Sequence, residues 1–427
     1  MYKPKANTHL RMLDVLAFIV GALSFAHVQV IGELYLSEIA LALLLLLLWR
    51  KKSALLRDAW VKRIIFVGFL WFMSQVITDL IRATPVSDLL RGWALIVVFL
   101  ADFAALYMLL SQNIRRIMIY VLGVALGGLV QPFLQPSPYF AAYPWQYGFG
   151  TPSILLTLTV ISFFCGNRLS KIRAWVVPLT VLGLLSFYLG SRTLGAFTIL
   201  TAFLIWFRSQ KLGKGLVVRL SIGKIALVGI ILLTVIFGLS KSYGYAAEQG
   251  WFGSLASYKY KMQSGGALGI IVGGRADVIP GLYAVLDSPI IGHGSWAQDS
   301  KYRLYFYKLL DLGYTDKDLV AFLKATVESS DLIPTHSHIL QAWVWAGVVG
   351  AIFWAVIFWL VLKSIILNYR FPTPLFVLVI FLGLQSVWDI LFSPFGAFMR
   401  LIWAMRLTIF IVSLFLVKAQ ASAEGNV

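Results

Sequence analysis

Charged residues are scarce in this chain: Asp, Glu, Lys and Arg make up 13% of its 427 residues, whereas 60% are hydrophobic. A soluble domain carries roughly 25% charged residues, so this composition excludes an ordinary soluble protein. Apolar runs of about 20 residues, the length at which a helix crosses a bilayer, recur along the sequence. The single cysteine, Cys165, cannot form a disulfide within the chain and says nothing about the redox compartment.

Internal repeats, low-complexity tracts and Cys/His clusters at metal-ligand spacing are also missing from the sequence. We therefore expect an all-α polytopic membrane protein, a single transmembrane domain over residues 1–427 with about twelve spans. The first run follows three basic residues, but a second run comes almost at once, so we interpret it as an uncleaved anchor. The predicted spans are 13–31, 34–49, 63–80, 92–110, 117–134, 152–166, 174–190, 193–207, 222–240, 338–362, 374–392 and 401–417.

The distribution of basic residues predicts how these spans are oriented. With the N-terminus inside, the cytoplasmic segments hold 22 of the 36 Lys and Arg residues. The short outer loops hold only Arg82, Arg91 and Arg192, and Arg400 stands at the mouth of the last span. This asymmetry follows the positive-inside rule and places both termini in the cytoplasm. The net charge of +18 is therefore a topology signal and does not indicate nucleic-acid binding.

One long hydrophilic segment, residues 241–336, interrupts the spans and is predicted to be an outer insertion between spans 9 and 10. Between Lys241 and Thr335 it carries nine basic and nine acidic residues, a balance unlike that of a disordered tail. We expect a folded, mostly helical cap over the membrane face. Asp316 and Asp318 are interpreted as the start of a helix, favoured by its macrodipole, rather than as ligands of a divalent metal.

Two histidines, His336 and His338, stand where this segment leads into the apolar run from Ile339 to Val361. Imidazole is well suited to moving protons near neutral pH, although a histidine at such a place also serves as a helix cap or a headgroup contact. Three charged residues fall inside predicted spans, where charges are usually paired or functional. We interpret these as Asp–Arg pairs that join helices, with proton or ion coupling as the alternative: Asp102, Asp389 and Arg406.

Several short motifs resemble those of one membrane enzyme family. His336-Ser337 is followed, after nine residues, by Gly347-Val348-Val349-Gly350, a spacing that resembles the signature of bacterial O-antigen ligases. Gly190-Ser191-Arg192-Thr193 resembles the Ser-Arg turn of this superfamily. Gly274-Arg275, with the stretch from Asp287 to Gly294, resembles its Arg and Asp-x-Pro-x-x-Gly-x-Gly elements. The similarity extends from about residue 190 to 350, and the earlier spans share only hydropathy.

The resemblance implies a type C glycosyltransferase fold with one large periplasmic loop, in the bacterial inner membrane. It implies a metal-independent, inverting enzyme without a cofactor that moves a glycan from undecaprenyl pyrophosphate to lipid A–core oligosaccharide. His336 then corresponds to the catalytic base. Arg192 and Arg275 are expected to bind the pyrophosphate, since guanidinium groups bind phosphate oxygens in pairs. Four further outer-face residues are candidate substrate contacts: His338, Arg82, Arg91 and Arg400.

Other functions remain open at this point. An O-antigen polymerase and a protein O-oligosaccharyltransferase belong to the same superfamily, and the single large outer loop favours the ligase over the polymerase. A secondary transporter would use Asp102, Asp389 and Arg406 as its coupling residues. Transporters usually show two repeated halves, and this sequence has no such repeat.

Overall fold

The structure is a computed structural model that describes residues 12–30, 32–136, 140–141, 143–210, 242, 244–251, 257, 260, 278–305 and 332–423. The chain forms two compact units. The helical unit comprises Met1–Trp206, Ala284–Ala297 and His336–Val427, and the second unit comprises Phe207–Tyr283 and Gln298–Thr335. Residues 284–297, which belong to the insertion expected over 241–336, therefore group with the helices.

The chain is helical from the beginning of the described part, with one short β-hairpin. Helix α1 (Met12–Ala22) and the 3₁₀ turn η1 (Leu23–Phe25) lead into strands β1 (His27–Gln29) and β2 (Glu33–Tyr35), which pair antiparallel. Helix α2 (Leu36–Lys52) follows directly. The hairpin was not predicted, because the sequence around it is as apolar as the two spans that flank it.

Six helices in the described residues are long and apolar enough to cross a membrane. Helix α3 has 23 residues, which at 1.5 Å per residue gives about 34 Å, against a hydrocarbon core of about 30 Å. The six are α3 (Ala59–Ile81), α4 (Val86–Leu110), α5 (Ile114–Leu134), η3 (Trp145–Phe149) with α7 (Gly150–Cys165), α19 (Val348–Arg370) and α21 (Ala397–Ala423).

The remaining helices are shorter, and three of them are also apolar: α9 (Val176–Tyr188), α15 (Val278–Asp287) and α20 (Phe376–Phe392). The others are η2 (Ser53–Arg57), α8 (Leu169–Arg173), α10 (Arg192–Ser209) and α18 (His338–Ala346). The prediction of an all-α protein with membrane-spanning helices is confirmed. Helices overlap the predicted spans, although 13–31 continues into η1 and β1 and 338–362 is divided between two helices; 222–240 lies outside the described residues. The full set of twelve spans and the outer cap stay predictions.

The span predicted over 338–362 is two helices rather than one. Helix α18 ends at Ala346 and α19 begins at Val348, on either side of Gly347, whose φ of +69° is incompatible with a continuous helix. Glycine adopts a positive φ without the steric penalty that a Cβ brings. The chain therefore changes direction at the first glycine of the Gly-x-x-Gly motif.

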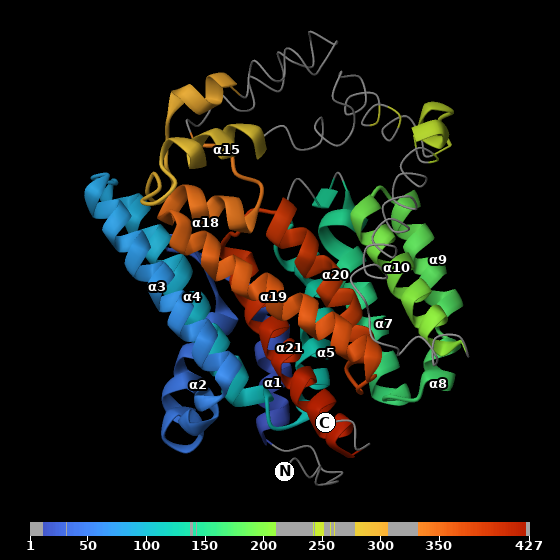
Figure 1. Ribbon diagram of the computed structural model, residues 1–427. Coiled ribbons are helices and arrows are strands. Elements are labelled where there is room, and N and C mark those ends of the chain that lie inside the picture. Colours follow the sequence, from blue (N-terminus) through green and yellow to red (C-terminus); the bar gives the residue numbers. More distant parts are fainter. Residues whose placement is uncertain are drawn as a thin grey trace. The chain divides into compact units, whose positions relative to one another are not determined.

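Aromatic side chains hold the centre of the helical unit together. The rings of Trp71 on α3 and Phe353 on α19 stack with centroids 4.8 Å apart, and Phe99 of α4 meets Phe353 edge-on at 6.0 Å. Phe395, just before α21, contacts the same group. Figure 1 shows α3 and α4 running side by side next to α19. This core fixes the helices whose ends carry the candidate site.

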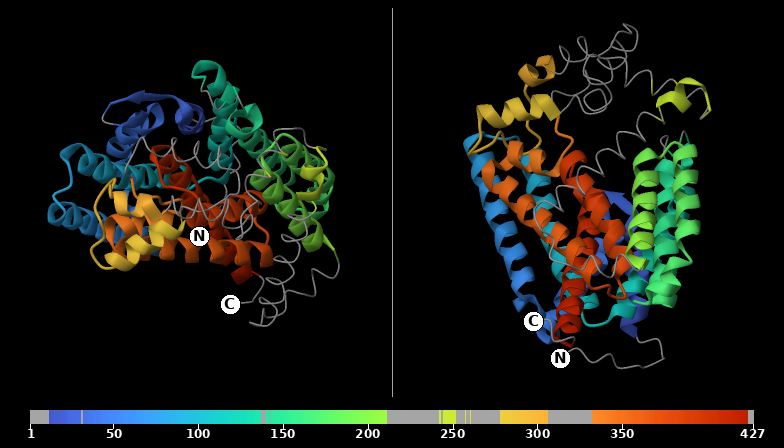
Figure 2. Two further views of the ribbon diagram at one scale, coloured as in Figure 1. Left: turned by 90° about the horizontal axis from the view of Figure 1, so that it is seen from above. Right: turned by 45° about the vertical axis from the view of Figure 1, so that its right-hand side comes forward.

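Helices α9 and α10 form a neighbouring pair that Figures 1 and 2 both show side by side. Glycines allow the close approach, because a Cβ on Gly183 would lie 3.0 Å from the carbonyl oxygen of Gly195. The ring of Phe197 on α10 meets Trp388 of α20 at 6.0 Å. The pair is thereby attached to the rest of the helical unit.

Basic residues gather at one end of these helices, which we call the basic end. Lys52 donates to the carbonyl of Met108, and its pKa is lowered by burial and by the neighbouring Arg116. Lys363 of α19 lies over the ring of Trp60, where α3 begins. The C-terminal ends of α19 and α21 also meet, as Figure 1 shows near its lower side.

The opposite end of the helices, which we call the far end, carries the arginines assigned to the outer face. Arg82 follows α3, which starts at the basic end, and Arg91 lies near the start of α4, which ends there. Arg400 lies in the first turn of α21. Helix α19 runs toward the basic end, so its beginning lies at the far end. His336 and His338, at the start of α18, therefore also lie at the far end. The residues assigned to the outer face therefore lie at the same end of the helical unit, and the orientation in the membrane stays a prediction.

Candidate functional site

The loop 288–296, which contains most of the Asp-x-Pro-x-x-Gly-x-Gly stretch, is fixed to the end of α3. The Nε atom of Arg82 donates to the carbonyl of Gly292 at 2.9 Å, and its Nη2 donates to Ser288 Oγ at 2.7 Å. Arg82 was predicted to contact substrate. Its guanidinium is engaged with the loop while the side chain is exposed, and the substrate contact stays a prediction.

The same loop packs against the break between α18 and α19. Gly292 has a φ of +85°, and a Cβ there would lie 2.6 Å from the amide nitrogen of Gly347. A Cβ on Gly347 would collide with the carbonyl oxygen of Ile290. Val348 donates its N–H to Pro289 at 3.0 Å. The two stretches that resemble ligase motifs, 287–294 and 336–350, are thus in direct contact, and glycine is needed on both sides.

A buried carboxylate, that of Asp79 at the end of α3, fixes the C-terminal part of this loop at Ser295. It accepts hydrogen bonds from Ser295 through both N–H (2.6 Å) and Oγ (2.7 Å), from Trp93 Nε1 (2.8 Å) and from Thr84 Oγ1 (3.0 Å). Several neutral donors around one buried acid replace the water that it has lost. Sequence reasoning did not single out Asp79. Its only signal was an acid near the end of an otherwise apolar run.

His338 lies inside the protein, fully buried at the start of α18. Trp403 Nε1 donates to its Nε2 at 2.7 Å, and its Nδ1 lies 2.6 Å from the carbonyl oxygen of Ser393. An indole N–H can only donate, so Nε2 is unprotonated and Nδ1 carries the hydrogen that Ser393 accepts. Both nitrogens of this neutral imidazole are occupied in joining α18 to α21 and to the segment before it.

His336 lies outside, with an exposed side chain. Between the two histidines, Ser337 caps α18: its Oγ accepts from the N–H of Leu340 at 3.2 Å and donates to the carbonyl of Ile390 at 2.9 Å. A serine at this position satisfies one of the amides that a helix start leaves unpaired. The cap therefore directs the chain so that His336 faces outward and His338 inward.

A pocket of about 590 Å³ opens at the far end of the helical unit. Its walls come from the β1–β2 hairpin, the first half of α4, the start of α21 and Trp296. Most of the lining is apolar, with a few polar groups. The lining residues are Gln29, Val30, Gly32, Glu33, Leu34, Arg91, Ala94, Leu95, Val98, Trp296, Gly396, Ala397, Phe398 and Arg400.

Helix α18 supports two walls of this pocket from behind. The rings of Trp345 and Trp296 lie with centroids 5.3 Å apart. Gln341 donates to the carbonyl of Phe395 at 3.1 Å and accepts its N–H at 2.7 Å, which holds the backbone next to Gly396. The helix that follows His336 thus positions both the aromatic wall and the α21 wall.

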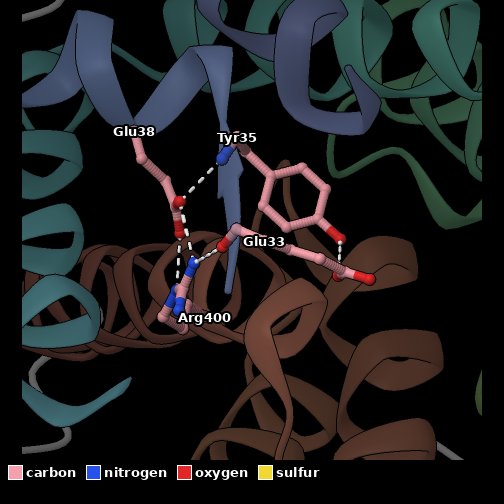
Figure 3. Close-up of polar contacts among 4 residues, drawn as sticks. All are labelled: Glu33, Tyr35, Glu38 and Arg400. Atoms are coloured by element: carbon pink, nitrogen blue, oxygen red, sulfur yellow. Dashed lines mark hydrogen bonds and ion pairs between the residues drawn. The ribbon is translucent and has the colours of Figure 1, made fainter. Parts of the chain in front are cut away.

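Arg400 forms part of the pocket wall, but its charge is already matched. Figure 3 shows its guanidinium held against Glu38 of α2, with Nε 2.6 Å and Nη2 2.9 Å from the two carboxylate oxygens. Nη2 also donates to the carbonyl of Glu33 at 2.7 Å. The N–H of Tyr35 donates to Glu38, and its hydroxyl donates to Glu33. Arg400, predicted as a substrate contact, thus ties the hairpin, α2 and α21 together.

A second acid lies beside this ion pair. Asp102 of α4 is 2% exposed and lies beside Glu38 and Arg400. Its Oδ2 atom has no hydrogen-bond partner among the described residues. Two buried acids, Glu38 and Asp102, therefore lie beside one guanidinium, that of Arg400.

The other predicted site residues lie at different places. Arg91 is half exposed on the pocket rim, 3.9 Å from Asp88. Arg192 is the first residue of α10 and is partly exposed, after Gly190 with its φ of +82°. Arg275 lies outside the described residues. The convergence of Arg192 and Arg275 on His336 stays a prediction.

One predicted pairing within the spans is confirmed. Arg406 Nη1 lies 2.6 Å from Asp389 Oδ2, which joins α21 to α20. Asp102 differs from that expectation, because in the described residues it forms no ion pair of its own and lies beside the Glu38–Arg400 pair. In the described residues no group of three or more His, Cys, Asp or Glu side chains could hold a metal ion, and Asp316 and Asp318 lie outside those residues.

Comparisons with known proteins give no match: neither a model of a known protein family, nor a curated protein, nor a solved structure is similar to this chain. Any conclusion about function therefore depends on the site itself and on the motifs within it.

Proposed function

We propose that this chain is a membrane-embedded glycosyltransferase of the O-antigen ligase kind. It transfers a glycan from undecaprenyl pyrophosphate to lipid A–core oligosaccharide at the periplasmic face of the bacterial inner membrane. The lipid carrier of the donor requires an enzyme within the membrane, which fits the apolar helices.

The observation that carries the proposal is the contact between the two motif stretches, 287–294 and 336–350. They meet through Gly292 and Gly347, although more than 40 residues separate them in the sequence. The first leads to Trp296, and the second begins at the exposed His336. An imidazole, an aromatic ring and the rim cation Arg91 thus all lie at the end of the helices that is poor in basic residues.

In the proposed reaction an acceptor hydroxyl attacks the anomeric carbon of the donor. His336 takes the hydroxyl proton as the new glycosidic C–O bond forms. The bond from the anomeric carbon to the pyrophosphate oxygen breaks, and its electron pair leaves with undecaprenyl pyrophosphate. A single displacement of this kind inverts the configuration. A positioned base of this kind contributes about 10²–10⁴ in rate.

The structure favours His336 over His338 as the base. The His338 nitrogens are already bonded to Trp403 and Ser393 in a fully buried site, so no lone pair is left for a substrate. His336 is exposed. Arg192 and Arg275 are assigned to the leaving pyrophosphate, where fixed guanidinium groups stabilise the charge that grows as the bond breaks. The reaction written this way needs no divalent cation.

The test is transfer by the purified protein in lipid nanodiscs, with lipid-linked glycan as donor and rough lipopolysaccharide as acceptor. We expect His336→Ala to lower the rate by about 10²–10⁴ and to leave thermal stability unchanged, because the side chain is exposed. His338→Ala is the matched variant and should lower the stability instead, through loss of two buried hydrogen bonds. Full activity of His336→Ala would contradict the assignment. Turnover should continue in the presence of a chelator.

Disruption of the gene separates this function from its rivals. Loss of a ligase leaves full-length glycan on its lipid carrier, whereas loss of a polymerase leaves cores capped with one unit. Loss of a transporter does neither. The closed Asp389–Arg406 pair, at 2.6 Å, serves as a helix-joining contact and gives the transporter alternative no support.

A further inference from the structure

Trp296 has a backbone conformation that is unusual for a large side chain. Its φ is +52°, in a region that bulky L residues rarely occupy. The conformation is imposed from both sides: Ser295 is bonded to Asp79 through its N–H and its hydroxyl, and the Trp296 ring lies against Trp345. Strain that the surroundings enforce in this way is concentrated at functional sites. It turns the indole toward the pocket that it lines.

The indole N–H adds a second unusual feature. The Nε1 atom of Trp296 is buried and has no acceptor among the described residues. An indole nitrogen is only a donor, and buried donors in native proteins are nearly always paired. Since Nε1 is buried while the residue lines the pocket, the ring of Trp296 is the part that a ligand meets.

The polar groups of the pocket are both donors and acceptors. Arg91 contributes a donor and Glu33 an acceptor, and the Gln29 amide offers both. The other cation, Arg400, is neutralised by Glu38, so the pocket has no excess of positive charge that would select a bare phosphate. A purely hydrocarbon ligand would leave the polar groups without partners. A saccharide combines hydroxyl groups, which donate and accept, with apolar C–H faces that fit an aromatic ring.

We propose that this pocket is a saccharide subsite for a lipid-linked sugar. A sugar ring stacks on Trp296, its hydroxyls bond to Gln29, Glu33 and Arg91, and the adjoining hydrocarbon runs along the aliphatic wall at Leu34 and Val98. The volume of about 590 Å³ lies within the range of about 300–1,000 Å³ that is usual for such sites. The inference rests on the proposed function. The sugar belongs either to the glycan donor or to the core acceptor.

Binding to the full chain in nanodiscs tests the subsite with three probes: undecaprenyl-pyrophosphate-linked glycan, rough lipopolysaccharide and sugar-free undecaprenyl phosphate. Trp296→Ala should raise the Kd of one of the sugar-bearing probes about tenfold, and Trp296→Phe, which keeps a ring, about threefold. Binding of undecaprenyl phosphate should change less than about twofold. The probe that is weakened identifies the source of the sugar.

Because Trp296 is part of a fixed loop, a second pair of variants keeps the test independent of folding. Ala94→Phe fills the pocket from the exposed side of α4 and should weaken the same probe. Val97→Phe, at an exposed position of the same helix outside the lining, is the matched control and should leave binding of that probe unchanged. Unchanged Kd values for both sugar-bearing probes, or equal weakening of all three, would overturn the subsite.

The transfer assay distinguishes failure of the subsite proposal from failure of the proposed function. A wild-type protein that transfers glycan while Trp296→Ala and Ala94→Phe bind and transfer normally would exclude the subsite alone. A wild-type protein that neither binds a sugar-bearing lipid nor transfers glycan would exclude both.

Discussion

Two buried ion pairs join helices at opposite ends of the helical unit, and their surroundings differ. At the basic end, Arg116 of α5 pairs through Nε with Asp14 of α1 at 2.9 Å, and its Nη1 donates to the carbonyl of Leu109. At the far end, Arg400 pairs with Glu38 at 2.6 Å. Both pairs are almost completely buried. Only the second lines a pocket and has an additional acid beside it.

The difference shows how one interaction serves two purposes. Among the described residues, the Asp14–Arg116 pair has one acid beside Arg116 and its neighbour Lys52, and it connects α1 to α5, so its role is to hold helices together. The Glu38–Arg400 pair belongs to a larger network with Asp102, Tyr35 and the hairpin, which together form a pocket wall. An ion pair at a binding site keeps a charged wall in place without leaving that charge uncompensated.

The largest expected effect comes from removing one member of each pair. Arg116→Met and Arg400→Met should each lower the free energy of unfolding by about 3–5 kcal/mol, because a buried carboxylate loses its counter-charge. Denaturant unfolding in mixed micelles measures this loss. The double variant Asp14→Leu/Arg116→Met should recover most of it, since a simple pair can be replaced by apolar side chains.

The corresponding double variant at the far end should recover little of the lost free energy of unfolding. In Glu38→Leu/Arg400→Met, the Tyr35 N–H loses its acceptor and the buried Asp102 loses the neighbouring guanidinium, and each uncompensated buried group costs about 1–3 kcal/mol. Equal recovery at both ends would show that the two pairs are equivalent and would remove the distinction.

Two glycines give a smaller, matched contrast. Gly166, after α7 at the basic end, has a φ of +56° and open space around it, so Gly166→Ala should cost about 1–3 kcal/mol of strain alone. Gly347→Ala at the far end adds a collision with the carbonyl of Ile290, for a further ~1–3 kcal/mol. Thermal unfolding of the two variants gives the comparison. A loss no greater for Gly347→Ala would mean that loop 288–296 is not tightly packed there.

The smallest effect is expected for Asp102→Asn. Two buried acids lie beside one guanidinium here, so an uncharged amide of the same shape at position 102 leaves Arg400 its counter-charge, and stability should fall by less than about 1 kcal/mol. Asp14→Asn is the matched control and should cost about 3–5 kcal/mol, because Arg116 loses its counter-charge. Similar losses for the two variants would show that the Asp102 carboxylate is needed as a counter-charge, as that of Asp14 is.

Much of the helical framework followed from hydropathy, because a membrane requires long apolar helices with their backbone groups paired internally. The Asp389–Arg406 pair followed from the high cost of isolated charge in such helices. The hairpin over 27–35 and the break at Gly347 could not be predicted from the sequence. The periodicity of hydrophobic residues does not reveal where a chain reverses or kinks. In the site, the roles of Asp79 and Glu38 depend on partners more than 60 residues away, Ser295 and Arg400. The role of Trp296 depends on its backbone angle φ.

The sequence by itself determined that the chain is a helical protein with membrane-spanning character and where most of its helices lie. Composition and charge asymmetry act on each segment separately, so no long-range contact is needed to recognise them. Only the tertiary structure decided that His336 is exposed and His338 is enclosed, and that Arg400 is neutralised by Glu38. It also brought residues 287–294 against the Gly347 turn. These outcomes depend on which groups meet across distant helices, and neither residue type nor spacing specifies that pairing.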